Sequence, residues 1–325
     1  MLGSLPDTFA VGELRYLWAR GIVERRSCGC GQPVPECPVW SKILTRAFTD
    51  DTAADVDRSI DAVNWLGDAS KLPRILRRGE RGRFPELGDL PARLGELYRT
   101  TAEVTGATTI IDSSKPPTYG WFLGTLPDIE LSVIHLVRDP RGTAFSWQHP
   151  KPAIDRPSGG LMPSKPPWKS ALSWALWNTA TELLFRSRPE RLLRIRYEDL
   201  VADPDRTLGA VLEFLGYPDD ALDSLDGRRF TRGASHTVAG NPSRITDEPT
   251  MLTLDAAWRT GMTKRARRVV TALSTPLLLR YGYKVRHQHD ATVIALEDPP
   301  KMSVARPVSL SESIHSSSEV HGSHR

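Results

Sequence analysis

The sequence predicts an α/β fold, a P-loop-type parallel sheet that is flanked by helices. Short apolar runs alternate with longer segments of helical periodicity, and several of these runs end abruptly in charged or small polar residues. The length of 325 residues is enough for one large domain. We expect this domain to cover residues 1–285. Residues 286–325 are polar and aperiodic, which predicts a disordered tail.

The first half of the chain predicts helices with one strand between them. Residues 1–20 indicate the end of a helical element and then an extended connection. The run PELGDLPARLGELYRTTAEVTG has apolar residues at helical spacing and predicts a helix that ends at Gly106. The β-rich run ATTIIDSSKPP predicts a strand that stops at Asp112, and TYGWFLGTLPD predicts a helix after it.

The stretch VIHLVRDPRGTAFSW, Val133 to Trp147, predicts a strand that passes into a helix. Its apolar half has the density of a strand buried on both faces, and Pro140 and Gly142 suit the turn and the first helical residues. Ligands collect at the carboxyl ends of parallel strands, and a helix start beside guanidinium groups suits a phosphate. A surface turn with ordinary salt bridges is the alternative.

The second half continues the alternation. WKSALSWALWNTATELLFRSR predicts an apolar helix, LLRIRYEDL a strand, and DPDRTLGAVLEFLGY a helix with Asp203 as its N-cap. FTRGASHTVAGNPSRI is a loop rich in small residues, with arginines near both ends. Such loops approach a ligand through their backbone, and they are as often plain solvent loops.

The charge balance is mildly basic, at +4 from 43 Lys and Arg against 39 Asp and Glu. This excess suits an anionic small ligand and is too small to indicate nucleic acid as a partner. No run predicts a transmembrane segment, and the N-terminus lacks a signal-peptide pattern. We therefore expect a cytoplasmic enzyme, and the sequence does not indicate its oligomeric state.

The three cysteines, Cys28, Cys30 and Cys37, all fall in CGCGQPVPECPVW. Three thiols at this spacing could ligate zinc, but the neighbouring sequence offers no evident fourth ligand. A disulfide between Cys37 and either of the other two, or a reduced turn, are the alternatives. We therefore predict no metal.

Four motifs in this order resemble the sulfotransferases that use 3′-phosphoadenosine 5′-phosphosulfate (PAPS), in particular their bacterial branch. The motifs are DSSKPP, VRDPRGTAFS, RYEDLVADP and HTVAGNPSRI. The resemblance runs from about Leu2 to Tyr283. It implies a sulfotransferase-like fold, PAPS as the sulfuryl donor, the nucleotide PAP as the product, and a hydroxyl or amine acceptor on a small molecule, carbohydrate or lipid.

The resemblance also implies the residues that bind the nucleotide. Arg138 and Ser146 would bind the 3′-phosphate. Arg244 would be the second arginine at this phosphate, from the loop HTVAGNPSRI (residues 236–245), which we call the late loop. Tyr197 would lie near the adenine. Ser114 would donate a hydrogen bond near the transferred group, although capping of the helix that starts near Thr118 is a competing role.

Sulfuryl transfer needs a base for the acceptor and a cation for the charge that develops on the leaving phosphate. Glu13 is the first candidate base, since some relatives place a catalytic glutamate in a similar Gly-Glu segment. An exposed glutamate that opens a helix is the competing interpretation. His236 is the second candidate base, and Lys115 is the candidate cation.

One expected motif is absent from the sequence. Sulfotransferases carry a Gly-Arg-Ser-Gly-Thr-type loop for the 5′-phosphosulfate between the first strand and the first helix, and MLGSLPDTFAVGELRYLW resembles the segment after that loop. We therefore expect the first strand and the phosphate loop to be missing, the sheet to have an open place, and transfer to be impaired. A non-catalytic PAP-binding or interaction protein is the alternative. A nucleotide kinase is disfavoured, because no Walker motif occurs.

Overall fold

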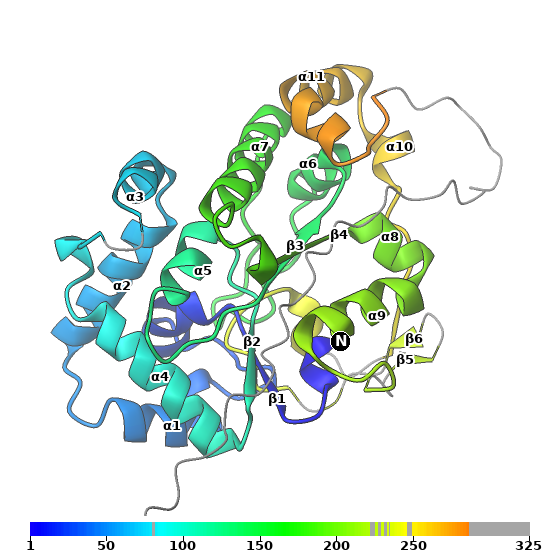
Figure 1. Ribbon diagram of the computed structural model, residues 1–325. Coiled ribbons are helices and arrows are strands. Elements are labelled where there is room, and N and C mark those ends of the chain that lie inside the picture. The colour runs from blue at the N-terminus through cyan, green and yellow to red at the C-terminus, as the bar shows by residue number, and fades with distance from the viewer. Residues whose placement is uncertain are drawn as a thin grey trace, which may run out of the picture.

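The computed structural model describes residues 1–79, 82–221, 225–226, 229–230, 233, 235–245 and 249–285. Parallel strands lie between helices, which confirms the α/β fold class (Figure 1). The tail predicted to be disordered lies outside the described residues. Among the described residues, no helix is both long enough and apolar enough to cross a membrane.

The strands are β1 (Thr8–Gly12), β2 (Thr109–Asp112), β3 (Val133–Val137), β4 (Leu192–Arg196), β5 (Leu225–Asp226), β6 (Arg229–Phe230) and β7 (Thr250–Met251). The α-helices are α1 (Trp40–Ala47), α2 (Ala53–Gly67), α3 (Leu72–Arg78), α4 (Leu90–Thr105), α5 (Pro117–Leu123), α6 (Pro140–Gln148), α7 (Pro167–Leu184), α8 (Tyr197–Ala202), α9 (Pro204–Leu215), α10 (Trp258–Gly261) and α11 (Lys264–Arg280).

The four longer strands form two parallel pairs, as the alternation of strands and helices predicts. β1 pairs with β2, and β3 pairs with β4 in continuous register from Val133–Leu192 to Val137–Arg196. The short strands β5, β6 and β7 form a separate antiparallel sheet. Parallel strands run in the same direction. The residues that come after β1 and β2 therefore lie together at the carboxyl end of that pair, and those that come after β3 and β4 lie together at the carboxyl end of the other pair.

β1 corrects the prediction for the N-terminal segment. Its residues fall in the predicted extended connection, and they form a strand that pairs with β2 from Thr8–Thr109 to Gly12–Asp112. The other edge of β1 is also bonded, because the Val238 N–H donates to Val11 O (2.9 Å) and the Glu13 N–H donates to Ala239 O (3.0 Å). These partners are far away in the sequence, so local periodicity did not reveal the strand.

The sheet is interrupted between β2 and β3. These two strands belong to different two-stranded sheets, and the described residues place no strand between them. The prediction that β3 is buried on both faces is wrong, because Leu136 in this strand is 51 % exposed.

The helices surround the paired strands: α1, α2, α4 and α5 lie to the left in Figure 1, α6, α7 and α11 above, and α8 and α9 to the right. α1, α2, α4 and α5 enclose the largest core with the segment after β1, and Trp18, Trp40 and Leu94 lie fully buried in it. α6, α7 and α11 pack against one another. Two predicted helix ends are confirmed: Gly106 ends α4 in the left-handed region (φ 71°), and the Asp203 side chain caps α9 by accepting from the Arg206 N–H.

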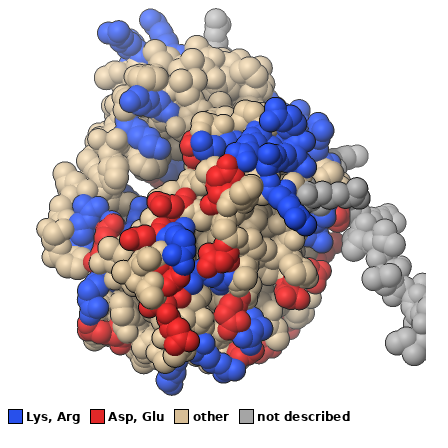
Figure 2. Space-filling model, turned by 90° about the vertical axis from the view of Figure 1, so that its left-hand side faces the viewer, with Lys and Arg blue, Asp and Glu red and all other residues tan. Residues whose placement is uncertain are grey.

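Acidic and basic side chains are mixed over the face in Figure 2, apart from one denser group of Lys and Arg. This mixture is in keeping with the small net charge of +4.

A buried ion pair joins the start of α6 to the end of the domain. Arg141, only 1 % exposed, donates to both oxygens of Asp139 at 2.9 and 2.6 Å and to the carbonyls of Lys284 and Val285. Its guanidinium also lies over the Trp258 ring, 4.7 Å from the centroid. From the sequence alone, Arg141 and Asp139 could form a surface ion pair or contact a ligand directly. The structure shows that the pair is buried and that its hydrogen bonds are made within the protein.

Arg141→Ala should lower the free energy of unfolding by about 3–5 kcal/mol, because it leaves the buried carboxylate of Asp139 without its partner. Arg99→Ala is the matched control. Arg99 forms ion pairs with Glu96 and Glu103 at the surface and is 55 % exposed, so its loss should cost no more than about 1 kcal/mol. Urea unfolding monitored by tryptophan fluorescence measures both. Equal losses would contradict a structural role for Arg141.

Candidate active site

Three of the predicted site residues meet at the carboxyl ends of β1 and β2. Glu13 comes directly after β1, and Ser114 and Lys115 come after β2. The Lys115 ammonium forms an ion pair with the Glu13 carboxylate, and Ser114 Oγ accepts from the Arg15 N–H at 3.2 Å. The Glu13 side chain is 10 % exposed and that of Lys115 is 75 % exposed. Glu13 is therefore not the exposed glutamate of the competing interpretation, and the ammonium is the part that faces solvent.

The half-buried carboxylate of Asp112 connects the two turns at these strand ends. Asp112 Oδ1 accepts from the N–H groups of Ser114 (2.7 Å) and Leu14 (3.4 Å), and Oδ2 accepts from the Tyr98 hydroxyl (2.6 Å). Burial raises the pKa of Asp112, and the hydrogen bonds from Tyr98 and Ser114 oppose that rise. Asp112 thus joins the turn after β1 to the turn after β2.

The predicted capping role of Ser114 is wrong. α5 begins at Pro117, its N-cap is Pro116, and no side chain caps it. The N–H of Ser113 donates instead to Gly12 O (2.7 Å), and Ser114 Oγ faces the turn after β1. These serines therefore serve the contact between the two strand ends.

Arg138 and Ser146 share one face of α6. An ideal Cβ on Gly142 would lie 3.3 Å from Arg138 Nε and 3.4 Å from Nη2, so the guanidinium covers the first turn of α6. Ser146 lies one helical turn after Gly142 on that face and is exposed. The strand-to-helix transition thus presents a guanidinium and a hydroxyl, while the Asp139 side chain caps α6 by accepting from the Arg141 N–H (2.8 Å).

Tyr197 and Asp255 complete the surroundings of Arg138. The Arg138 guanidinium lies 4.8 Å from the centre of the Tyr197 ring, and Nη2 donates to Asp255 Oδ2 at 2.8 Å. The Tyr197 hydroxyl donates to Thr253 O (3.1 Å) and accepts from the Asp255 N–H (3.3 Å). Hydrogen bonding from Arg138 lowers the pKa of Asp255, so this carboxylate is charged at neutral pH.

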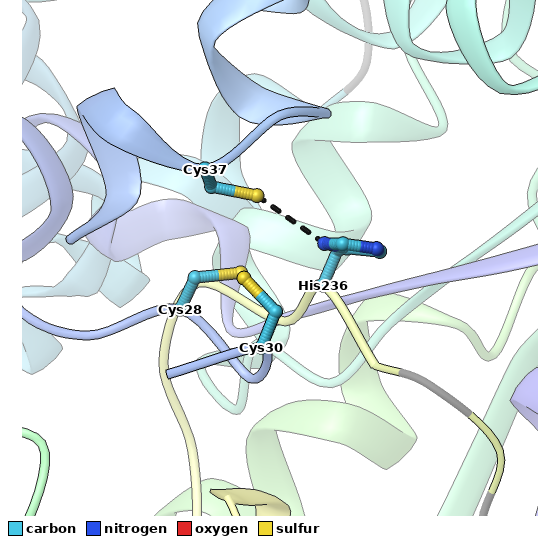
Figure 3. Close-up of side chains that lie close together, drawn as sticks. All are labelled: Cys28, Cys30, Cys37 and His236. Carbon is cyan, nitrogen blue, oxygen red and sulfur yellow. Dashed lines mark hydrogen bonds between the residues drawn. The ribbon is translucent and has the colours of Figure 1, made fainter. Parts of the chain in front are cut away.

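Arg244 and His236 lie against the cysteine segment instead. Arg244 is buried, and its guanidinium donates to Thr237 O (2.7 Å), to Ser27 O (2.6 Å) and to Asp155 Oδ2 (3.3 Å). His236 Nδ1 lies 3.2 Å from Cys37 Sγ (Figure 3). Burial lowers the pKa of both groups. The late loop is thus held beside β1 through Ala239. Within the described part of the chain, its two candidate residues, Arg244 and His236, contact the cysteine segment and do not contact the residues around Arg138.

Three features of the site are not evident from the sequence. Asp255 lies outside all four motifs, and only its position in space makes it the partner of Arg138. The sequence predicts Asp112 only as the end of a strand and not as a half-buried acceptor, although an aspartate after an apolar run is a signal for such a role. The fourth group beside the cysteines is His236, which the sequence separates from Cys37 by 199 residues.

Comparison with known proteins agrees with the resemblance. Residues 121–242 match the family model described as "Sulfotransferase domain", which confirms the resemblance to sulfotransferases over a segment that contains β3, α6 and β4. A search of curated proteins found no match.

Two similar solved structures have sulfotransferase titles. The "Sulfotransferase Domain from the Curacin Biosynthetic Pathway" is 16% identical, with a TM-score of 0.42, over 84% of this chain and 90% of that chain. The "Sulfotransferase Domain from the Synechococcus PCC 7002 Olefin Synthase" is 16% identical, with a TM-score of 0.36, over 83% and 93%. At these scores the two structures carry no argument about the site.

Asp112→Ala should lower the free energy of unfolding by about 2–4 kcal/mol, because it removes the acceptor of three part-buried donors. Asp112→Asn keeps one acceptor oxygen and should lose less. Asp128→Ala, at an exposed position, should change the free energy by no more than about 0.5 kcal/mol. Urea unfolding measures all three, and a loss at Asp112 no larger than that at Asp128 would contradict its role in joining β1 to β2.

Proposed function

We propose that the chain is a PAPS-dependent sulfotransferase that transfers a sulfuryl group to a hydroxyl or amine on a small-molecule, carbohydrate or lipid acceptor. The observation that carries the proposal is the turn from β3 into α6. It lies within the segment that matches the sulfotransferase domain, and it holds Arg138 over the first turn of the helix, beside Tyr197. A cytoplasmic location stays a prediction.

The 3′-phosphate of the nucleotide is assigned to Arg138 and Ser146. A guanidinium can donate two parallel hydrogen bonds to a phosphate, and a serine hydroxyl adds a further donor. The ring of Tyr197 offers a flat surface for the adenine. Arg244 is assigned as the second arginine, a role that requires its guanidinium to exchange the carbonyls of Thr237 and Ser27 for the phosphate.

Asp255 gives the phosphate site a competing anion. Its carboxylate accepts the hydrogen bond that Arg138 would donate to the phosphate, so the nucleotide has to displace it. A carboxylate left beside the phosphate would repel it. We therefore assign Asp255 a restraining role: it neutralises Arg138 when the site is empty and lowers the affinity for the nucleotide.

Lys115 and Glu13 are assigned to the transfer step. The Lys115 ammonium would neutralise the charge that develops on the bridging oxygen as the sulfuryl group leaves, and Ser114 could donate a hydrogen bond beside it. The Glu13 carboxylate, released from the ion pair as Lys115 turns to the donor, would accept the proton of the acceptor hydroxyl or amine. His236 is the weaker candidate base, since its Nδ1 already contacts Cys37 Sγ.

A non-catalytic PAP-binding protein is the second candidate function. The sequence contains neither a Gly-Arg-Ser-Gly-Thr-type loop nor a Walker motif, and either of these would supply N–H donors to the 5′-phosphosulfate. Removing one such donor commonly lowers the rate about 10²–10³-fold. Binding of PAP without transfer from labelled PAPS to any of a panel of acceptors would favour this second function.

Arg138→Lys should weaken PAP binding about tenfold or more, because an ammonium cannot reproduce the two parallel hydrogen bonds. Asp255→Asn should do the opposite and tighten binding several-fold, because it removes the competing charge at a partly exposed site. Isothermal titration calorimetry measures both dissociation constants.

The control ligand for these variants is adenosine 5′-phosphosulfate, which lacks the 3′-phosphate. Neither substitution should change its affinity by more than about twofold, since its contacts with Arg138 are absent. Equal effects on both nucleotides would show that Arg138 serves another phosphate. A weaker affinity for PAP in Asp255→Asn would contradict the restraining role of Asp255.

Glu13→Gln should lower kcat by about 10²–10⁴-fold, because it removes the base that accepts the proton of the acceptor. Lys115→Ala should lower kcat by about 10²–10³-fold. Lys42→Ala, at an exposed position of α1, is the control and should keep full activity. Transfer of ³⁵S from labelled PAPS measures the rates. Unchanged turnover in Glu13→Gln would remove Glu13 as the base.

A further inference from the structure

A compact group of metal-ligating side chains lies outside the nucleotide site. The ligating atoms of Cys28, Cys30, Cys37 and His236 all lie within 4.8 Å of one another, and Figure 3 shows the four side chains converging. We propose that these four residues bind one Zn²⁺ ion in a tetrahedral site. The cysteine thiolates supply three ligands, and the imidazole supplies the fourth.

The distances suit zinc with small side-chain adjustments. Zinc lies about 2.3 Å from sulfur and about 2.0–2.1 Å from nitrogen, so the ligating atoms of a tetrahedral site lie about 3.6–3.8 Å apart. The Cys37 Sγ to His236 Nδ1 distance is 3.2 Å, and the widest separation in the group does not exceed 4.8 Å. Rotation of side chains by about 1 Å is enough to surround an ion.

The backbone holds the cysteine turn in the shape that the site needs. The Cys28 N–H donates to Gln32 O (2.7 Å), and the Gly31 N–H donates to Cys28 O (2.9 Å). Gly31 has a φ of 87°, which glycine adopts without strain. This tight turn presents Cys28 and Cys30 on one side, and Cys37 comes directly after the short 3₁₀ helix Val34–Glu36.

Hydrogen bonds and the close approach at a glycine also connect the late loop to this turn. The Gly29 N–H donates to Thr237 O (3.0 Å), and a Cβ on Gly29 would lie 2.7 Å from the main-chain oxygen of Ser235, so only glycine permits the approach. Trp40 Nε1 donates to His236 O (2.5 Å), and the Phe9 ring stacks on the imidazole with centroids 6.5 Å apart. His236 is thereby oriented with Nδ1 toward the thiols.

The chemistry of the group favours a closed, structural site. Cys28 and Cys37 are fully buried and Cys30 is exposed, so an ion can enter from the Cys30 side. All three cysteines are free thiols, and a single disulfide would leave one thiol and the imidazole unused. Four protein ligands leave no position for a catalytic water. The site therefore serves to hold the late loop to the N-terminal segment, and His236 becomes a ligand rather than a base.

The first experiment measures metal in the full-length chain, purified under reducing conditions. Inductively coupled plasma mass spectrometry should find one zinc per chain. Co²⁺ added to the chelator-treated protein should give the absorption of tetrahedral cobalt with thiolate ligands, and Zn²⁺ should displace it. Substoichiometric zinc together with no cobalt–thiolate absorption would overturn the proposal. A mass two hydrogens lower than that of the fully reduced chain would show a disulfide instead and would overturn it as well.

Variants at the fourth ligand separate the site from simple thiol reactivity. His236→Ala should weaken Co²⁺ binding about 100-fold or more, whereas His236→Cys should keep one Co²⁺ per chain with an absorption changed toward four thiolates. His149→Ala, at an exposed histidine after α6, is the control and should bind like the parent chain. If His236→Ala does not fold, the His236→Cys spectrum decides: an absorption identical to that of the parent would show that His236 is not a ligand.

Discussion

The main-chain hydrogen bonds between residues 237–239 and the N-terminal segment are the contacts on which the candidate site depends. They occupy the edge of β1 that β2 does not pair with, and they include the N–H of Glu13, the candidate base. An exposed edge would leave these polar groups unpaired or open to another chain. Gly12 permits the approach, because its φ is 78° and a Cβ there would lie 2.5 Å from Ala239 O. The late loop therefore pairs the free edge of β1, and the same hydrogen bonds hold the main chain of Glu13 in place.

Both candidate cations of the site are neutralised by a carboxylate in this structure. Lys115 is paired with Glu13 at the ends of β1 and β2, and Arg138 is paired with Asp255 at the ends of β3 and β4. An anionic group that binds at either place has to displace the carboxylate there. The proposed transfer therefore requires both ion pairs to open, that of Arg138 for the 3′-phosphate and that of Lys115 for the leaving phosphate.

The sequence predicted the features that depend on neighbours along the chain. β2, β3 and β4 follow from local apolar runs, Gly106 from its C-cap chemistry, and Asp203 from its N-cap chemistry. It did not predict β1, because both partners of that strand are distant. Leu136 was expected to be buried because an apolar run does not reveal that the sheet is interrupted beside it. The burial of Arg141 depends on Trp258 and on residues 284–285, and the position of His236 depends on a contact across 199 residues.

The contact between His236 and the cysteine segment explains why a bound metal ion would strongly affect the docking of the late loop. Ordering residues 235–239 costs about 5–10 kcal/mol of conformational free energy. Residues 236–239 form four hydrogen bonds with the N-terminal segment, at Gly29, Val11, Glu13 and Trp40, and these contribute about 4 kcal/mol at about 1 kcal/mol each. Burial of Val238 adds about 2 kcal/mol. The docked and undocked states of the loop are thus close in free energy, and a structural Zn²⁺ site contributes more than the difference. An ion held by Cys28, Cys30, Cys37 and His236 would therefore decide whether Glu13 and Arg244 are in place.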